Sequence, residues 1–381
     1  MPHALSTSPP SPVPLVTCHI DSHTNLYHAC NLVAGLYTLE ERGEIRLRVV
    51  APHDGKTNYT GDSLILWLEV AHASGAVTKA AIDLFDRSDR FALPALAACD
   101  VYCKRSYYEP DLSAVPGGFR HKIRPFGLNY ACRTSRSSRR VLRLLAADYL
   151  IRAARSGVLG FRALLAAAQS VQVRGFLRSP LVEEFEQPPT VELDPVIVFQ
   201  TRLWSQDELG PGENAEEING DRVAIVRALK TAFPDHFAGG LMPTPLALAK
   251  YRDLVSLQPD KRREFIRWNR RCLIGIQTRG LHHSLPFKLA EYLAASKCIV
   301  TSPLRHVLPV PPLTGVHYLE FRCPQECVEH CARLLHDTRL VNELRSAAWE
   351  YYRTEVHPAA RAARLLHRIH AAETRQSMSA V

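Results

Sequence analysis

Short apolar runs rich in β-branched residues alternate along this chain with longer stretches in which apolar residues recur every three or four positions. The first pattern is typical of buried strands, and the second of helices that cover a sheet. Their alternation predicts an α/β protein of βαβ units around parallel sheets, arranged as two Rossmann-like halves in tandem. The predicted strands span residues 15–20, 45–51, 64–70, 80–85, 101–103, 196–200, 237–241, 273–277 and 298–301. The predicted helices span residues 28–41, 138–169, 223–232, 261–271, 285–295, 324–335, 339–356 and 358–372.

Prolines divide this pattern into domains. Four prolines lie between residues 180 and 195, and the alternation of strands and helices begins again after them. Because proline ends helices and disrupts sheets, we place a domain boundary near residue 190. The predicted organisation is a disordered lead (1–14), an N-terminal Rossmann-like domain (15–190), a C-terminal Rossmann-like domain (191–356), and a C-terminal helix and tail (357–381).

The composition fits a globular protein of 381 residues, of which 46% are hydrophobic and 22% charged. No apolar run reaches the roughly 18 residues that a membrane-spanning helix needs. The first residues also lack the basic start and apolar centre of a signal peptide. We therefore expect a cytoplasmic protein whose ten cysteines remain mostly buried thiols.

Positive charge is concentrated in one helical block. Ten arginines and one acid lie between Arg133 and Arg178, a balance equal to the net charge of the whole chain, +9. The block is either a solvated face that pairs with neighbouring segments or a docking surface for an anionic membrane; no nucleic acid is expected. Arg152 lies over half a turn from Arg139 and Arg143, so the charges do not share one helical face. This spread favours the first interpretation.

The stretch from Cys272 to Ser302 carries the most chemical information. It is predicted to form a strand, a loop with a glycine, a helix and a second strand. In a parallel sheet ligands bind beyond the carboxyl ends of the strands, so the loop from Thr278 to Ser284 should face a crevice. We expect Ser284 to cap the helix that follows, which leaves the first helical amides, from Leu285 on, directed at an anion such as a phosphate.

Two charged residues lie on one face of that predicted helix. Lys288 and Glu291 are three positions apart in an otherwise apolar segment, so both point to the same side. Either they pair with each other at the edge of the helix, or they bind a polar ligand.

The run from Pro286 to Thr301 resembles the nucleotide-sugar-binding region of group 1 glycosyltransferases with the GT-B fold. In that family a glycine loop leads into a helix that carries a Glu, followed by small residues and a β-branched strand. The resemblance covers most of residues 194–366 and is weaker in the first half. It implies two Rossmann-like domains that face each other across a cleft, with the C-terminal helices packing back toward the N-terminal domain. The implied activity is transfer of a hexose from a nucleotide-activated donor to an acceptor hydroxyl.

The resemblance also implies roles for single residues. Glu291 would receive the ribose hydroxyls of the donor, because a carboxylate accepts two hydrogen bonds at once. Arg202, Lys288 and the amides around Leu285 would hold the diphosphate. Gly280 and Ser284 would bind the donor from the loop.

This chain departs from the family at two positions. The best-known retaining members carry a second Glu eight positions before the first, where this chain has His283. They also carry a Lys five positions after the Arg, where this chain has Asp207. We expect His283 to contact the donor sugar and Lys288 to replace the missing cation. Because of these departures a second interpretation stays open: the chain is an inactive glycosyltransferase-like protein that binds a ligand without turnover or acts as a scaffold.

Catalytic candidates in the first half follow the first predicted strand. In inverting members a His at this place removes the proton from the acceptor hydroxyl, and its ordinary pKa near 6.5 suits that role. His23 is the candidate base and Asp21 the acid that orients it. The alternative is that Asp21 and Ser22 cap the next helix while His23 is solvated.

Metal chemistry is not expected. The chain has no Asp-x-Asp pair of the kind that holds donor phosphates through a divalent ion, so we expect a nucleotide sugar as substrate and no cofactor. Cys323, Cys327 and Cys331 have the spacing of one helical face, and we expect them to pack in a core rather than bind zinc.

Overall fold

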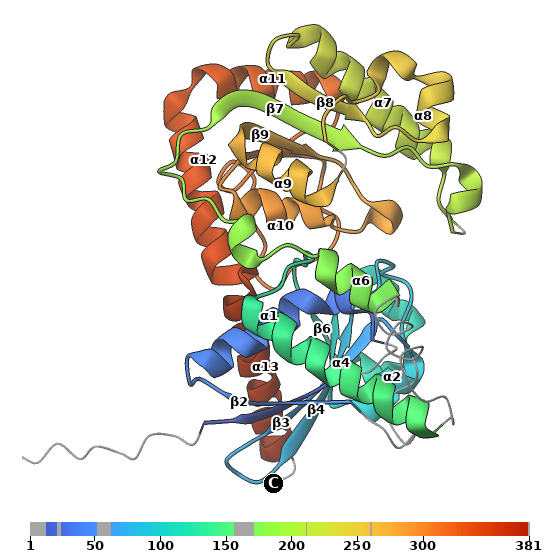
Figure 1. Ribbon diagram of the computed structural model, residues 1–381, viewed down its shortest axis with the longest axis vertical. Coiled ribbons are helices and arrows are strands. Elements are labelled where there is room, and N and C mark those ends of the chain that lie inside the picture. Colours follow the sequence, from blue (N-terminus) through green and yellow to red (C-terminus); the bar gives the residue numbers. More distant parts are fainter. Residues whose placement is uncertain are drawn as a thin grey trace, which may run out of the picture.

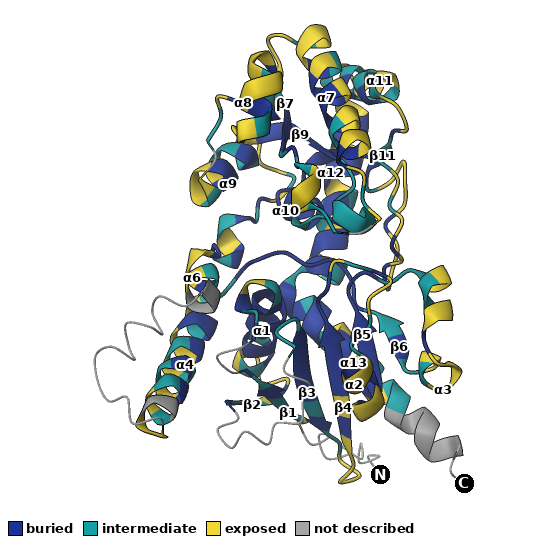
Figure 2. Cartoon of the chain, turned by 90° about the vertical axis from the view of Figure 1, so that its right-hand side faces the viewer, coloured by how far each residue is buried: buried dark blue, intermediate teal, exposed yellow. Residues whose placement is uncertain are grey.

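The computed structural model describes residues 13–20, 24–51, 62–155, 171–210, 212–259 and 261–379. The predicted lead over residues 1–14 falls almost entirely outside these ranges. The elements form two lobes stacked along the long axis of the molecule, each built around one sheet (Figure 1). In both lobes most strands are largely buried, and the exposed residues lie mainly on the outer faces of the helices and in the connecting loops (Figure 2).

The first lobe contains a six-stranded sheet in the order β2-β1-β3-β4-β5-β6. Strand β3 runs antiparallel to both of its neighbours, and the other pairs are parallel. The prediction of a parallel sheet is therefore wrong at β3. Only five residues, 72–76, join β3 to β4, which is too short for a parallel crossover, and Gly75 with a φ of +85° makes the turn. The strands are β1 (Leu15–His19), β2 (Arg46–Val50), β3 (Ile65–Ala71), β4 (Val77–Asp83), β5 (Val101–Lys104) and β6 (Ile123–Pro125).

Helix α1 is the central helix of the first lobe. It begins after Asn25, whose side chain accepts a hydrogen bond from the amide of His28 at 3.3 Å. Most of its residues are buried, because α4, α6 and α13 pack around it. The helices of this lobe are α1 (Leu26–Glu41), α2 (Leu93–Ala98), α3 (Gly117–Arg120), α4 (Ser135–Arg155) and α6 (Val171–Arg178), with 3-10 helices at Glu109–Ala114 and Val182–Glu184.

The second lobe contains a five-stranded parallel sheet in the order β11-β10-β9-β7-β8. The strands are β7 (Asp194–Thr201), β8 (Phe237–Leu241), β9 (Cys272–Gln277), β10 (Cys298–Thr301) and β11 (Leu319–Glu320). The helices are α7 (Ala215–Ala232), α8 (Pro245–Lys250), α9 (Arg262–Arg271), α10 (Phe287–Ala294), α11 (Pro324–His336) and α12 (Thr338–Tyr351), with 3-10 helices at Gln206–Glu208, Arg252–Leu254 and Leu281–His283.

The chain then returns to the first lobe. A π-helical turn, Tyr352–Val356, continues α12, and α13 (Pro358–Ser379) packs against α1 (Figure 1). The resemblance implied two facing α/β lobes and C-terminal helices that pack back on the first lobe. The structure has both features, so the predicted fold class is confirmed. Arg361 of α13 donates hydrogen bonds to the side chains of Asn31 and Asn129, at 2.7 and 3.1 Å.

The predicted core packing is confirmed for two of the three cysteines near the start of α11. Cys327 and Cys331 are buried in the core of the second lobe, as predicted, whereas Cys323 is exposed.

In the arginine-rich block, Arg136 and Arg140 both pair with Glu40 of α1, at 2.9 and 2.8 Å, which agrees with a face that pairs with its neighbours.

Residues 156–170 of the block lie outside the described ranges, and membrane docking stays a prediction. Of the helices that the structure describes, none combines the length and the apolar character needed to cross a membrane.

Gly35 marks the closest approach of α1 and α13. A Cβ atom at this position would overlap the carbonyl group of Pro358 and lie 2.9 Å from the Cβ of Ala362. We expect Gly35→Ala to lower the free energy of unfolding by about 1 to 3 kcal/mol through overpacking, despite the better helix propensity of alanine. Urea unfolding followed by circular dichroism measures the change.

Gly220 provides the matched control, because it lies inside α7 and a Cβ added there would meet no atom within 4 Å. We expect Gly220→Ala to be neutral or to stabilise the protein by up to about 1 kcal/mol. Equal effects of the two substitutions would contradict the close packing of α13 on α1.

Candidate functional site

A cavity of about 330 Å³ opens at the carboxyl ends of β7 and β9. These two strands are neighbours, but the chain leaves β7 toward β8 on one side of the sheet and leaves β9 toward β10 on the other. Such a point, where the strand order reverses, is the usual ligand crevice of an open α/β sheet. The cavity wall includes both strand ends, the loop after β9, the starts of α9 and α10, and Tyr27 from the first lobe. The predicted crevice at the loop after β9 is therefore present.

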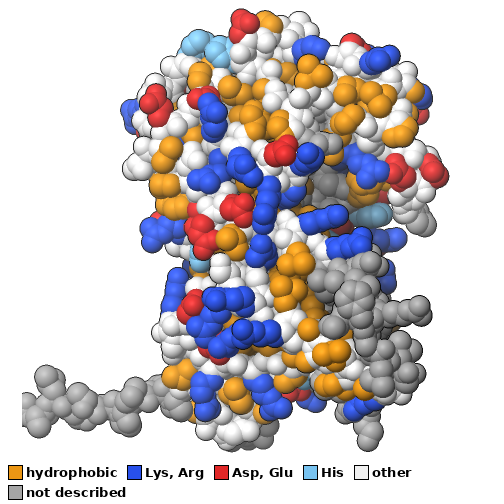
Figure 3. Space-filling model, in the orientation of Figure 1, with side chains coloured by type: hydrophobic (Ala, Val, Ile, Leu, Met, Phe, Trp, Pro, Cys, Tyr) orange, Lys and Arg blue, Asp and Glu red, His pale blue; other side chains and the backbone are white. Residues whose placement is uncertain are grey.

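Positive charge dominates the wall of this cavity. Among the described residues that line it, five are basic and one, Glu291, is acidic. On the molecular face shown in Figure 3, Lys and Arg side chains gather around the level where the two lobes meet. An anionic ligand is favoured by this balance. The basic residues are Arg202, Arg222, Arg262, Arg279 and Lys288.

Glu291 of α10 forms a buried ion pair with Arg262, the first residue of α9. The guanidinium donates two hydrogen bonds, from Nη1 to Oε2 at 3.0 Å and from Nη2 to Oε1. Only 3% of Glu291 is exposed, and a carboxylate at that depth needs such a partner. The pairing of Glu291 with Lys288, one of the two predicted alternatives, is not formed.

Lys288 turns instead toward the end of β7. Its ammonium group donates a hydrogen bond to the backbone carbonyl of Gln200 and lies 5.3 Å from the centre of the Phe265 ring. Burial lowers the pKa of Lys288 to about 8, partly offset by the nearby Glu291. The residue is thus a desolvated cation at the cavity wall, which close contact with an anion would stabilise.

Several buried polar atoms at the cavity have no hydrogen-bond partner among the described residues. They include Nε2 of Gln200 and Oε1 of Gln277, at the ends of β7 and β9, and Nε1 of Trp204. Gln200 and Gln277 are each only 3% exposed. Because buried polar groups are almost always hydrogen-bonded, these atoms indicate a ligand that offers both donors and acceptors. The sequence analysis missed both glutamines, although each ends an apolar strand.

Two arginines follow or support the strand ends, and one of them, Arg222, connects the two sides of the crevice. The guanidinium of Arg202 lies 4.1 Å from the centre of the Trp204 ring and pairs with Glu208. Arg222 of α7 donates hydrogen bonds to the backbone carbonyls of Arg202, at 2.5 Å, and Arg279, at 3.2 Å. Burial lowers the pKa of Arg222 to about 10. The sequence analysis did not identify Arg222 or Arg262.

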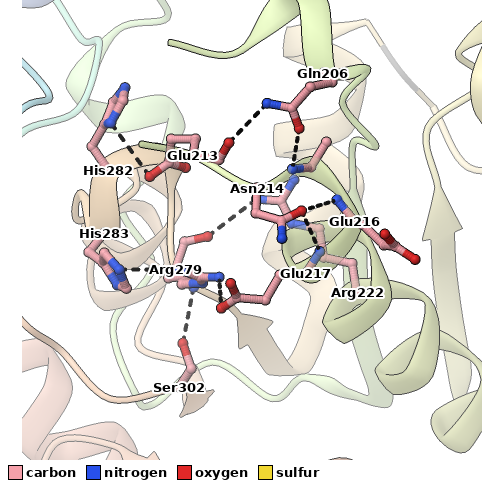
Figure 4. Close-up of polar contacts among 11 residues, drawn as sticks. Gln206, Glu213, Asn214, Glu216, Glu217, Arg222, Arg279, His282, His283 and Ser302 are labelled. Carbon is pink, nitrogen blue, oxygen red and sulfur yellow. Dashed lines mark hydrogen bonds and ion pairs between the residues drawn. The ribbon is translucent and has the colours of Figure 1, made fainter. Parts of the chain in front are cut away.

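The loop between β9 and α10 is strained and tightly held. His282 and His283 both have left-handed backbones, with φ of 55° and 56°, which is unfavourable for residues other than glycine. His283 contacts Arg279 at 3.1 Å, and His282 lies 3.5 Å from Glu213 (Figure 4). A Cβ on Gly280 would lie 2.5 Å from Oγ of Ser284, so the narrow turn requires glycine.

The predicted start of α10 is wrong. The helix begins at Phe287, and its N-cap is Pro286 rather than Ser284. A residue before proline is forced out of the helical conformation, so Leu285 cannot belong to the helix. Ser284 and Leu285 are buried and do not line the cavity, and His283 lines a second cavity on the other side of the loop.

The structure therefore brings four of the predicted donor-binding residues to one cavity, namely Arg202, Gly280, Lys288 and Glu291. The two catalytic candidates of the first half, Asp21 and His23, lie outside the described residues. Within the described part of the chain, no group of three or more His, Cys, Asp or Glu side chains is arranged to hold a metal ion.

Comparison with known proteins gave structural similarities only. No protein-family model and no curated protein matches the sequence. A glycosyltransferase from Rickettsia africae is 12% identical, covers 88% of this chain and 73% of its own, and has a TM-score of 0.38. MnaA of S. aureus, solved with UDP, is 11% identical with 92% and 94% coverage and a TM-score of 0.38. Anabaena Alr3699/HepE, in complex with UDP and glucose, is 11% identical with 87% and 88% coverage and a TM-score of 0.38.

The pair of Arg262 and Glu291 is expected to be energetically coupled. Arg262→Met leaves a buried carboxylate without its partner, and we expect it to lower the free energy of unfolding by roughly 1 to 3 kcal/mol, since the Arg262 side chain is 31% exposed. The double variant with Glu291→Met should lose less than the sum of the two single variants, because no charge is then left buried.

Urea unfolding of the four proteins in this cycle measures the coupling. Arg263→Met is the control, because its contact with Glu184 is long, at 3.9 Å, and Arg263 is 47% exposed. Strict additivity of the two single substitutions would contradict the ion pair.

Proposed function

We propose that this protein is a glycosyltransferase that moves a sugar from a nucleotide-activated donor to an acceptor hydroxyl. The observation that carries the proposal is the cavity between β7 and β9, where five basic residues and one acid surround polar atoms without a hydrogen-bond partner in the described part of the chain. A nucleoside diphosphate combines the features that this wall requires, namely a double anion, hydroxyls and a base with hydrogen-bonding edges. The cavity opens toward the first lobe, where Tyr27 forms part of its wall and an acceptor would approach.

The donor would be held by residues of the second lobe. Glu291 keeps free acceptor positions after pairing with Arg262, because each carboxylate oxygen accepts more than one hydrogen bond, and we assign it the ribose hydroxyls. Arg202 and Lys288 would face the diphosphate, together with the amides at the start of α10, which have no carbonyl one turn earlier within the helix. Gly280 would let the backbone approach the phosphates. We assign His283 to holding Arg279 rather than to the donor sugar.

The reaction would proceed by attack of the acceptor oxygen on the anomeric carbon. The bond from that carbon to the phosphate oxygen breaks, and the nucleoside diphosphate leaves with the electron pair. The basic residues of the cavity would stabilise the negative charge that develops on the leaving group, without a divalent metal. His23, oriented by Asp21, remains our proposed base for the proton of the acceptor hydroxyl.

A second candidate is a protein that binds a nucleotide sugar without transferring it. It is favoured by the carboxylate partners that Arg202 and Arg279 already have within the protein, Glu208 and Glu217, because these pairs reduce the charge available to a leaving diphosphate.

A screen of donors separates these two functions. Nucleoside diphosphates and their sugars should raise the melting temperature of the full chain, whereas the uncharged nucleosides should not, because the cations bind the diphosphate. Hydrolysis of the same nucleotide sugars, or transfer to added acceptors, would then support the transferase. Binding without any turnover would support the binding protein, and absence of nucleotide binding would contradict both. A 2′-deoxynucleotide that binds as tightly as the ribonucleotide would remove the ribose role of Glu291.

Nucleotide binding should depend on pH through Lys288. The folded pKa of about 8 lies below the ordinary value of 10.5, so the ammonium group loses its proton as the pH rises through about 8, and affinity for the diphosphate should fall there. Titration of a nucleoside diphosphate between about pH 7 and pH 9.5 should show a several-fold loss in the native protein. Lys288→Met should bind more weakly at neutral pH and show a flatter profile. An unchanged pH dependence in that variant would show that another group titrates.

A further inference from the structure

A second cavity, of about 440 Å³, lies beside the proposed donor cavity. The two cavities share Thr278 and Arg279 as a common wall, so the loop after β9 separates them. The second cavity is bounded by α7, by the segment that follows β10, and by the start of α11. The proposed donor contacts do not account for it.

Arg279 makes the shared wall rigid. Its guanidinium donates to Glu217 at 2.6 Å and contacts Nε2 of His283 at 3.1 Å, and its backbone amide donates to Oγ of Ser302 at 3.0 Å (Figure 4). Arg222 holds the carbonyl group of the same residue from the side of α7. These contacts come from α7, the loop and the end of β10, so the cavity wall is fixed from three directions.

Two further arginines line the second cavity with their charges available. Arg305 is exposed, and its guanidinium lies 4.1 Å from the centre of the Tyr108 ring, a contact that does not use its N–H donors; among the described residues these donors have no hydrogen-bond partner. Arg322 is 78% exposed and donates a hydrogen bond at 3.3 Å to Glu320, with which it forms an ion pair. An exposed pair of this kind is weak and is readily exchanged for a ligand. An anionic group can therefore be held by both guanidinium groups.

The remaining wall is suited to hydroxyl groups on an apolar ring. Asp221 and Ser302 offer side-chain oxygens that accept hydrogen bonds, while Ile225, Phe321 and Pro303 provide apolar surface. Asp221 is exposed at the edge of this cavity. A purely apolar ligand would use neither of the two oxygen-bearing side chains, and a bare inorganic anion would leave the apolar surface uncovered. A sugar ring has hydroxyl edges and apolar faces, and it matches both parts of the wall.

We propose that the second cavity binds a hydroxylated anion, a sugar that carries a carboxylate or a phosphate. Arg305 and Arg322 bind the anionic group, and Asp221 and Ser302 accept hydrogen bonds from hydroxyls. Binding at this site does not depend on transferase activity.

Titration calorimetry on the full chain tests the proposal with four probes: glucuronic acid, glucose 1-phosphate, glucose and inorganic phosphate. The uronic acid, the sugar phosphate or both should bind, and glucose should not, because it lacks the anionic group. Arg305→Gln and Arg322→Gln should each weaken binding by about tenfold or more, since each removes a charge-assisted hydrogen bond. Arg333→Gln is the matched control, an exposed arginine of α11 that pairs with Asp337 and does not line the cavity.

Each outcome of these titrations either supports or overturns the proposed binding site. Whether the carboxylate or the phosphate probe binds tells which anionic group the site takes. The proposal is overturned if neither acidic sugar binds, if glucose or inorganic phosphate binds as tightly as they do, or if Arg305→Gln and Arg322→Gln behave like Arg333→Gln. Thermal-shift measurements with a nucleoside diphosphate on the same variants distinguish binding in the second cavity from binding in the donor cavity. A native protein that binds the acidic sugar but no nucleotide would contradict the proposed function and leave this inference intact.

Discussion

The reversal of strand order between β7 and β9 is the constraint on which the candidate site depends. Because the chain leaves these two neighbouring strands in opposite directions, their carboxyl ends form the wall of a cavity. Helix α10 packs closely on β9, and Gly275 makes this possible: a Cβ there would lie 2.7 Å from the ring of Tyr292. Lys288 and Glu291 of this helix line the cavity at the ends of the strands.

Contacts between the lobes fix which surface the cavity faces. The hydroxyl groups of Tyr130 and Tyr352 are 2.9 Å apart, and Arg105 of the first lobe donates to the carbonyl group of Leu285 at 3.2 Å. The hydrogen bond from Arg105 to Leu285 joins the first lobe to the loop between β9 and α10, which also separates the two cavities. The residues with left-handed backbones, His282 and His283, lie in the same loop.

The sequence predicted the elements well and their partners poorly. Hydrophobic periodicity located most strands and helices, and the spacing of Lys288 and Glu291 correctly put both on one face of α10, the face that lines the cavity. The five-residue link after β3 was a readable sign of a hairpin, and Pro286 a readable sign that α10 starts late. The pairing of Glu291 with Arg262 had no such sign, because it joins two helices whose approach is set by tertiary packing. The atoms Nε2 of Gln200 and Oε1 of Gln277, which have no hydrogen-bond partner among the described residues, are likewise defined only by the cavity around them.

Charge burial explains why the cavity favours an anion. Glu291 is neutralised by Arg262, but the hydrogen bonds of Lys288 and Arg222 end on backbone carbonyl oxygens, which carry only partial charge. Burial accordingly lowers the pKa of both residues, to about 8 and about 10, so each cation is less stable there than in water. An anion that enters the cavity reverses this effect and raises both pKa values. Since Lys288 is the group that titrates near neutral pH, ligand binding above pH 8 must be coupled to proton uptake at this residue.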